Sequence, residues 1–262
     1  MPRLNLPEVE DQSWLPRVLR DAMTGYLRVA IGFSKPYAVV APVLAELTRA
    51  HGADQIVDLA SGGGGPWPEL HEALRTELGR HPTVTLTDVN PNLTAAGALE
   101  QLPGLSYRRE SVSALAVPPG LSGVRTMFTG LHHFSEAEVK DLFRSAQDAQ
   151  VPFLAAEATH RSVRGVLVTA LVPLLVLLLM PLVKPRRPLP LLLTYLPPLL
   201  PVLIWWDGFA STLRSYRASE VRTLAESVAV PGYSWQVEEL PAPGAPIPVT
   251  LIVGRPARLS AS

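Results

Sequence analysis

Cysteine is absent from all 262 residues of this chain. Its absence excludes disulfides, thiolate nucleophiles and cysteine-based metal sites, and it suits a cytosolic protein. An excess of charge is missing too, because 23 Lys and Arg residues balance 23 Asp and Glu residues. Nucleic-acid binding usually requires a basic excess, so we predict no nucleic-acid partner. The first residues are polar and acidic and lack an apolar core, so we predict no signal peptide.

Proline, in contrast, is abundant, with 27 residues, roughly twice the usual share of about 5%. The length fits one large domain, or one domain that carries an insertion. Apolar residues recur at helical spacing from Gln12 to Thr48, and Pro36 and Pro42 divide this stretch into two or three helices. We expect these N-terminal helices to cap one end of a sheet.

Strands and helices are predicted to alternate along the next hundred residues. Short apolar runs predict five strands, at 55–59, 83–89, 105–109, 124–129 and 152–156. Helices are predicted at 68–78, up to Leu99 from a cap at Asn90 and Pro91, and from a capping box at Ser135 and Glu138 through Gln147. This alternation is typical of a doubly wound α/β sheet, which binds ligands at the carboxyl ends of its strands.

A glycine-rich segment follows the first predicted strand, in the sequence QIVDLASGGGGPW from Gln55 to Trp67. Its glycines can adopt positive φ and bring backbone N–H groups against a ligand, while Asp58 can accept hydrogen bonds from hydroxyls. An ordinary flexible turn is the alternative interpretation of the glycines alone. Asp88 lies near the end of the second predicted strand, and the sequence LHHF at 131–134 follows the fourth, so we expect all three features at one edge of the sheet.

On these residues the sequence resembles class I S-adenosylmethionine-dependent methyltransferases. Their first motif reads acid-x-Gly-x-Gly-x-Gly, which Asp58, Gly62 and Gly64 match, with Ala60 in place of the first glycine. Asp88 matches the family's ribose-binding acid, and LHHF resembles the motif beside the transferred methyl. The resemblance implies S-adenosylmethionine as the cofactor. The residues that it implies for cofactor binding are Asp58, Ala60, Ser61, Gly62, Gly64, Asp88, Val89, Ser111 and Val112.

The end of the chain extends this resemblance. Residues 234–239 and 250–253 resemble the antiparallel last strands that distinguish this fold from nicotinamide-binding sheets. A dinucleotide-binding loop requires Gly-x-Gly-x-x-Gly, and from Gly62 the third glycine position holds Trp67, which disfavours that class. We therefore predict an α/β fold with a doubly wound, mostly parallel Rossmann-like sheet whose last strand is antiparallel. Its predicted parts are an N-terminal helical cap (1–50), a core (51–160 and 207–262) and an apolar helical insertion (161–206).

The predicted insertion contains two long uncharged runs joined by the basic sequence KPRRP at 184–188. The first run, 165–183, has 19 residues, which would span about 28 Å as a helix, close to the thickness of a bilayer core. Prolines interrupt both runs, and spanning would place the basic turn on the far side, against the positive-inside tendency. We therefore predict a shallow hairpin, 165–206, that contacts the cytoplasmic face of a membrane. A true span, or burial against the sheet or a second subunit in a cytoplasmic protein, are the alternatives.

Methyl transfer requires an acceptor aligned with the methyl group and sometimes a base. We predict His132 and His133 as bases, because imidazole accepts a proton near neutral pH, and a capping or packing role is the alternative. In related methyltransferases the segment after the fifth strand often lines the acceptor pocket. Here that segment places Asp207 and Tyr216 as predicted catalytic residues, and Trp206 and Arg214 as predicted substrate-binding residues, although a surface salt link is the alternative. We predict no metal site, because the other histidines show no ligand spacing.

The sequence thus predicts methyl transfer from S-adenosylmethionine to an apolar small molecule, with the hairpin delivering an acceptor dissolved in the membrane. Two alternatives stay open: a protein that binds the cofactor without methylating, and a membrane-hairpin interaction protein on a Rossmann-like scaffold. The acceptor, the methylated element and the oligomeric state are left open, and an oligomer is compatible with the sequence.

Overall fold

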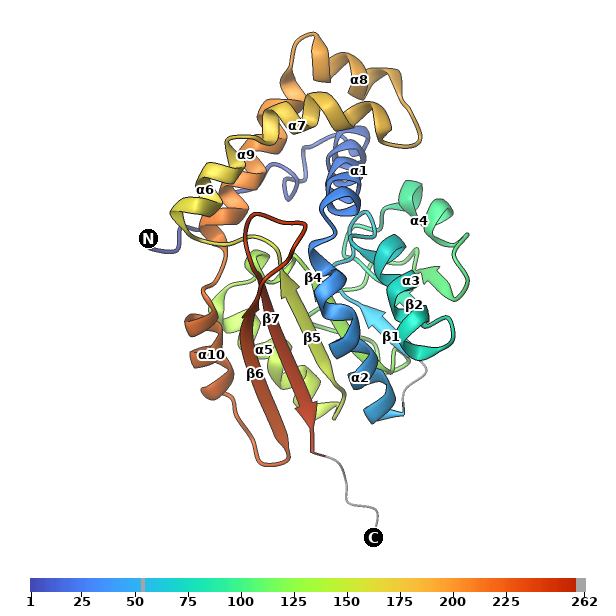
Figure 1. Cartoon of the computed structure of the whole chain (residues 1–262), viewed down its shortest axis with the longest axis vertical. Helices are drawn as coiled ribbons and strands as arrows, with labels where there is room; N and C mark the ends of the chain where they lie inside the picture. Colours follow the sequence, from blue (N-terminus) through green and yellow to red (C-terminus); the bar gives the residue numbers. More distant parts are fainter. Residues whose placement is uncertain (53–54, 258–262) are drawn as a thin grey trace.

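A seven-stranded sheet with the order β3-β2-β1-β4-β5-β7-β6 forms the centre of the molecule in the computed structural model (Figure 1). The structure describes residues 1–52 and 55–257, so residues 53, 54 and 258–262 of the predicted core lie outside the described part. The strands are β1 (Gln55–Asp58), β2 (Thr83–Leu86), β3 (Leu105–Tyr107), β4 (Val124–Phe128), β5 (Phe153–Glu157), β6 (Tyr233–Leu240) and β7 (Val249–Pro256). The first five pair in parallel, and β7 runs antiparallel to both of its neighbours. The predicted fold class is confirmed.

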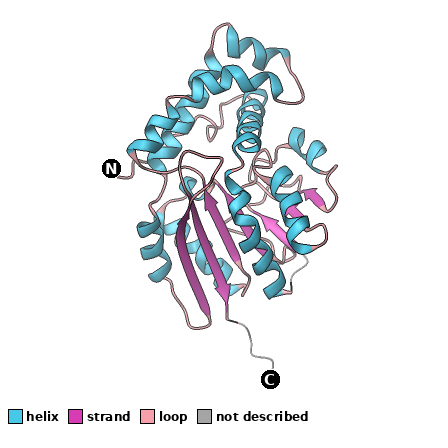
Figure 2. Cartoon of the chain, viewed as in Figure 1, coloured by secondary structure: helices cyan, strands magenta, loops and turns pink. Residues whose placement is uncertain are grey.

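Helices cover both faces of the sheet (Figure 2). On one face lie α2 (Ala41–His51), α3 (Trp67–Leu78) and α4 (Leu93–Leu99), whose apolar side chains share a core with β1, β2 and β3. On the other face lie α5 (Glu136–Asp148) and α10 (Ala218–Glu226). Because the sheet is covered on both sides, every residue of β4 and β5 is buried. This burial is why their sequences read as continuous apolar runs.

Of the predicted helix caps, the one before α5 is confirmed and the one before α4 is wrong. The capping box before α5 is present, with the Ser135 N–H donating to Glu138 and the Glu138 N–H donating to Ser135 Oγ. The predicted cap of α4 at Asn90 is wrong, because this helix begins at Leu93 and the Asn92 side chain accepts from the Ala95 N–H. The N–H of Asn90 instead donates to Asp88 Oδ1 at 2.7 Å, so that residue belongs to the turn around the carboxylate.

A helical layer lies beyond the carboxyl ends of the parallel strands, at the top of Figure 1. It contains α6 (Val163–Thr169), α7 (Val172–Leu179), η3 (Met180–Leu182), α8 (Pro188–Tyr195) and α9 (Leu199–Arg214). The long helix α1 (Arg17–Ser34) packs against this layer through a separate apolar cluster that includes Met23, Val176 and Ile204. After α1, the short helix η1 (Pro36–Val40) leads into α2. Helix α9 runs unbroken through residues 206 and 207, where the sequence suggested a boundary.

By length and composition, one helical stretch, Val163–Leu182, is apolar enough to cross a bilayer. Two bent helix pairs pass the same test only if each pair is taken as one span: Arg17–Ser34 with Pro36–His51, and Pro188–Tyr195 with Leu199–Arg214.

Candidate functional site

The loop between β1 and α3 has left-handed backbone at several positions. Gly62, Gly64 and Gly65 have φ of 49°, 94° and 45°, and Ala60, at the position where the motif usually has glycine, also adopts a φ of 53°. The loop is tightly enclosed as well. A Cβ on Gly63 would lie 3.0 Å from the Thr24 carbonyl oxygen of α1, and one on Gly64 would lie 2.4 Å from Leu99 Cδ1 of α4. Backbone conformation therefore favours glycine at 62, 64 and 65, and close approach favours it at 63 and 64.

Asp58, at the end of β1, organises this loop from below. Its carboxylate accepts hydrogen bonds from the Thr126 hydroxyl at 2.7 Å and the Ser61 hydroxyl at 2.6 Å. Burial raises the pKa of Asp58 to about 6, although these hydrogen bonds act in the opposite direction. The carboxylate does accept from hydroxyls, as the sequence suggested, but the hydroxyls belong to the chain itself.

Asp88 joins the glycine loop to the end of β2. Its Oδ2 accepts from the Gly62 N–H at 2.8 Å, and its backbone carbonyl accepts from the Val112 N–H at 2.9 Å. The next side chain, Val89, is 57% exposed, and its carbonyl accepts from the Ser111 hydroxyl at 2.8 Å. The sheet therefore brings the residues predicted for cofactor binding together at the carboxyl edge of β1 and β2.

The end of β4 meets the same loop. Thr129 has a φ of 47°, which is rare for a β-branched residue, and it follows the strand directly. A Cβ on the next residue, Gly130, would lie 3.6 Å from the Ala60 Cβ. Two non-glycine residues with left-handed backbone thus occur at adjacent strand ends, and such strain concentrates at functional sites.

His132 lies in the short helix η2 (Leu131–His133) and is 1% exposed. Its Nδ1 lies 2.8 Å from Oε2 of Glu157, the last residue of β5, whose Oε1 accepts from the N–H groups of Gly130 and Leu131. In the neutral ring the proton therefore lies on Nδ1, and Nε2 carries the lone pair. Burial acts to raise the pKa of Glu157, but the His132 ring and the Leu131 N–H outweigh it and lower that pKa. His132 Nε2 is buried without a hydrogen-bond partner.

Residues 1–16, the N-terminal strap, cross over this histidine pair. The Asp207 carboxylate of α9 holds the strap by accepting from the N–H groups of Val9 at 2.7 Å and Glu10 at 2.9 Å. The indole N–H of Trp206 donates to the Pro7 carbonyl at 2.9 Å. Burial raises the pKa of Asp207 to about 6, against the effect of the two N–H donors. Asp207 and Trp206 thus anchor the strap in this structure.

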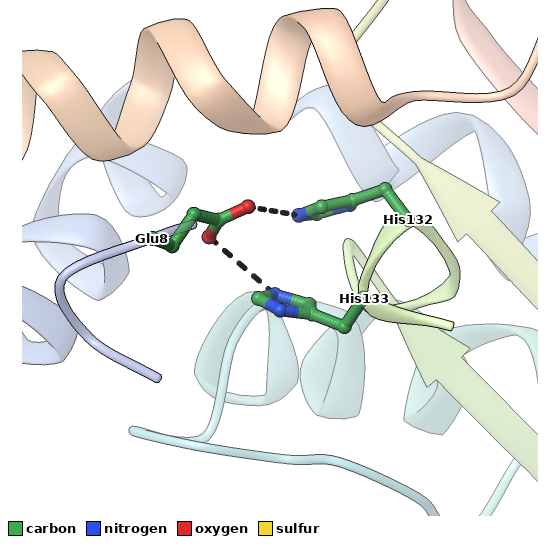
Figure 3. A group of neighbouring side chains, drawn as sticks. All are labelled: Glu8, His132 and His133. Atoms are coloured by element: carbon green, nitrogen blue, oxygen red, sulfur yellow. Dashed lines mark ion pairs between the residues drawn. The ribbon is translucent and has the colours of Figure 1, made fainter. Parts of the chain in front are cut away.

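The strap inserts two acids, Glu8 and Asp11, beside the histidines, and Figure 3 shows Glu8 facing the two rings. Glu8, which is buried, places Oε1 3.6 Å from His132 Nε2 and Oε2 3.7 Å from His133 Nε2. Asp11 Oδ2 lies 3.1 Å from His133 Nδ1. Burial acts to lower the pKa of His133, but the hydrogen bond to Asp11 and the charge of Glu8 raise it to about 9. The cluster therefore attracts positive charge.

Arg214, at the end of α9, ties the strap to the LHHF segment. Its Nη1 donates to Glu8 at 3.2 Å and Asp11 at 3.1 Å, while its Nε and Nη2 donate to the carbonyls of His132 and His133. The Tyr216 hydroxyl donates to the Phe134 carbonyl at 2.8 Å. Of the four residues predicted after the fifth strand, only Arg214 contacts the histidine pair. Trp206 and Asp207 bind the strap, and Tyr216 binds the Phe134 carbonyl.

The sequence reasoning missed Glu8, Asp11 and Glu157. The sequence does contain an indication for Glu157, because an acid at the end of an apolar strand must find polar partners when it is buried. Glu8 and Asp11 had none, because more than a hundred residues separate them from the histidines that they contact.

A scan against protein-family models and a search of curated proteins found no match to this sequence. Solved structures do match. A SAM dependent methyltransferase from Aquifex aeolicus aligns over 89% of this chain and 97% of its own, with a TM-score of 0.51 and 9% identity. This chain has the class I methyltransferase fold. The pyocyanin biosynthetic protein PhzM aligns over 87% of this chain and 56% of its own, with a TM-score of 0.50 and 16% identity.

The mitomycin 7-O-methyltransferase MmcR aligns over 84% of this chain with 16% identity and a TM-score of 0.49. The alignment covers 54% of MmcR, so this chain spans about half the length of MmcR and PhzM. In the class I methyltransferase fold of this chain, the glycine loop, Asp88 and the histidine pair all lie at the carboxyl edge of the parallel strands, where ligands of open α/β sheets bind.

Proposed function

We propose that this chain transfers a methyl group from S-adenosylmethionine to an apolar small-molecule acceptor. The convergence of the glycine loop, Asp88 and His132 at one edge of a class I methyltransferase sheet carries the proposal. Asp88, a half-buried acid, follows β2, and His132 follows β4. These are the positions at which the family resemblance places the ribose contact and the reacting methyl.

The residues at this edge fit the cofactor. The Asp88 carboxylate is half-buried and accepts one backbone N–H at each oxygen, so each oxygen keeps a lone pair for a ribose hydroxyl. The exposed Val89 side chain offers an apolar surface next to the Asp88 carboxylate. The left-handed backbone at Gly62 and Gly64 allows the loop to approach the cofactor without an intervening side chain. When bound, S-adenosylmethionine supplies an electrophilic methyl group on its sulfonium sulfur.

His132 would accept the acceptor's proton. Glu157 fixes the proton of the neutral ring on Nδ1, which leaves the Nε2 lone pair for an acceptor hydroxyl. The carboxylate of Glu157 would then stabilise the imidazolium that forms. Because Glu8 faces Nε2 at 3.6 Å, the strap must move to admit the acceptor. Asp207 and Arg214 would act by holding the strap, as positioning residues.

Calorimetric titration with S-adenosylmethionine tests the cofactor part of the proposal. We expect binding by the wild type and at least about tenfold weaker binding by Asp88→Asn, because hydrogen bonds to a charged group contribute about 1.5–3 kcal/mol. Asp141→Asn, on the exposed surface of α5, is the matched control and should bind normally. Absence of cofactor binding by the wild type would refute the proposal.

Turnover tests the transfer itself. With a lipid extract as the source of acceptors, we expect S-adenosylhomocysteine to form with the wild type and not with His132→Gln, while that variant still binds the cofactor. Binding without product from either protein would instead support a cofactor-binding protein that does not methylate.

We also propose that the helical layer contacts a membrane surface on its cytoplasmic face and supplies the acceptor from it. Apolar side chains are exposed along the outside of α6 to α9, namely Val163, Leu167, Leu171, Leu174, Leu178, Leu182, Leu189, Leu192, Leu196 and Val202. Water solvates these exposed side chains poorly, and large apolar patches on a protein surface mark interaction sites. The inward side of the same layer is packed against α1, and Pro173 and Pro181 interrupt the apolar stretch, which favours shallow insertion over a span.

The basic turn at 184–187 also supports membrane contact by this layer, because each Lys or Arg near anionic headgroups contributes about 1 kcal/mol to membrane binding. Helix α9 connects this layer to the histidine pair, since it carries both the exposed Val202 and the buried Arg214.

Flotation with anionic liposomes tests membrane contact. The wild type should float with the vesicles, and Leu174→Glu combined with Leu178→Glu should abolish flotation. Phe33→Glu changes an equally exposed apolar residue at the far end of α1 and should float normally. Recovery of the wild type in the soluble fraction would contradict the membrane proposal, and assembly into a dimer at the same patch would explain that result.

A further inference from the structure

Glu8, His132 and His133 form a cluster that the methyl-transfer proposal uses only in part. One atom from each side chain, a carboxylate oxygen and one ring nitrogen of each histidine, lies within 4.8 Å of the other two. Figure 3 shows the Glu8 carboxylate facing both rings, with one oxygen toward each. The sequence did not predict this set, because the two histidines are consecutive and the acid comes from the distant strap.

Both rings are oriented in the same way by a second carboxylate. His132 Nδ1 lies 2.8 Å from Glu157, and His133 Nδ1 lies 3.1 Å from Asp11. Each imidazole therefore has its Nδ1 proton engaged and directs Nε2 toward Glu8. Histidines that bind metals in proteins usually donate their other ring N–H to a carboxylate or carbonyl in this manner.

One of these nitrogen atoms lacks any partner. His132 Nε2 is buried and accepts no hydrogen bond, although its side chain is only 1% exposed. A buried polar atom without a partner costs free energy, so it indicates a ligand that completes its bonding. Glu8 Oε1 lies 3.6 Å from this nitrogen, which is too far for a hydrogen bond.

The spacing fits a small cation. In a tetrahedral zinc site with bonds of about 2.0–2.1 Å, neighbouring ligand atoms lie about 3.4 Å apart. Glu8 Oε1 lies 3.6 Å from His132 Nε2 and Glu8 Oε2 lies 3.7 Å from His133 Nε2, so the carboxylate places one oxygen near each ring nitrogen, a few tenths of an ångström beyond this spacing. The ligand atoms of the three side chains all lie within 4.8 Å of one another, so the side chains rotate toward a common centre when an ion binds.

The surrounding charges also favour a cation. Four carboxylates, those of Glu8, Asp11, Glu157 and Asp207, belong to the network around the histidines. The Arg214 guanidinium contacts two of them, Glu8 and Asp11. Glu8 Oε2 faces His133 at 3.7 Å, so this oxygen is available to a metal while Arg214 holds Oε1.

We propose that His132 Nε2, His133 Nε2 and the Glu8 carboxylate bind a divalent transition-metal ion of the zinc type. Two imidazoles and one carboxylate favour zinc over magnesium or calcium, which prefer sites made only of oxygen ligands. The bound ion clasps the strap to the sheet edge and occupies the lone pair of His132. If the proposed function holds, zinc therefore inhibits methyl transfer by keeping the strap closed.

Zinc binding by the full-length protein, stripped with a chelator, tests the site. Titration against a chromophoric competitor should show one equivalent bound by the wild type. We expect at least about tenfold weaker binding by Glu8→Gln and by His133→Gln, which each remove one ligand. His81→Gln removes an exposed histidine outside the cluster and should bind as the wild type does. No binding by the wild type, or equal affinities across all four proteins, would overturn the proposal.

Hydrogen exchange of the strap separates this proposal from the proposed function. Zinc should slow exchange of the amides of residues 8–11 in the wild type and His81→Gln but not in His133→Gln, which keeps the Asp207 anchor. The same amides should not respond to magnesium. Zinc binding with unchanged strap exchange would overturn the clasp. A zinc site without any methyl transfer would leave this site in place and refute the function, whereas transfer that is insensitive to bound zinc would refute the inhibitory role.

Discussion

Removal of the Asp207 side chain should release the N-terminal strap. In Asp207→Ala the N–H groups of Val9 and Glu10 lose their acceptor, at 2.7 and 2.9 Å. A hydrogen bond to a charged group contributes about 1.5–3 kcal/mol, so two of them contribute about 3–6 kcal/mol to holding the strap. The lower end applies here, because burial raises the pKa of Asp207 to about 6 and the charged form therefore pays a desolvation cost.

A loss of about 3 kcal/mol corresponds to a roughly 100-fold larger equilibrium constant for opening at the two amides, and hence to faster exchange. Hydrogen exchange monitored at Val9 and Glu10 measures this directly. Ser211→Ala is the matched control, since its hydroxyl donates to the Asp207 carbonyl one turn along α9 and none of its hydrogen bonds reaches the strap. It should leave the exchange of both amides unchanged.

The same variant separates an anchor from a catalytic residue. Exchange that stays at the wild-type rate in Asp207→Ala would refute the anchoring role. If turnover were then lost in spite of a closed strap, the sequence-based assignment of Asp207 to catalysis would stand instead.

Three further predictions concern the glycine loop. In Asp58→Asn the pH dependence of stability should flatten, because the folded-state pKa of Asp58, about 6, lies above the reference value of 3.8, so the wild type loses up to about 3 kcal/mol as the pH rises through that window. Urea unfolding at pH 4 and pH 7 checks this, and an equal change in the free energy of unfolding in both proteins would contradict it. Ala60→Gly should raise the free energy of unfolding by about 0.5–1 kcal/mol by relieving the left-handed backbone, and unfolding that is unchanged or easier would argue against that strain. Gly64→Ala should cost about 2–4 kcal/mol, because its Cβ would overlap Leu99, and Gly65→Ala, with open space around it, only about 1–2 kcal/mol; equal costs in thermal unfolding would show that the overlap is relieved.

Much of the fold could be predicted from local sequence signals. The strands β1, β4 and β5 were found because short apolar runs that are buried on both faces are distinctive, and the capping box at Ser135 marked the start of α5. The start of α4 was misplaced because two asparagines stand near each other, and only the position of the Asp88 carboxylate decides which of them is recruited to its turn.

The cofactor side of the candidate site could be predicted from the sequence, whereas the strap over the histidine pair could not. The glycine loop and Asp88 follow strands directly, so the topology of a parallel sheet alone brings them to one edge. Arg214 and Tyr216 were placed near the site, but the direction of their polar groups depends on how α9 approaches η2. The strap was not predicted, because residues 1–11 carry no periodic pattern.

The sequence by itself determined the sheet, the loop after β1 and the apolar character of the insertion. Each depends on the spacing of residues close together in the chain, and hydrogen bonding and burial act on that spacing locally. Only the tertiary structure decided that Glu8 meets His132 and His133, and that Asp207 anchors the strap. Such contacts depend on the path of the whole chain across the sheet edge, and local sequence carries no record of that path.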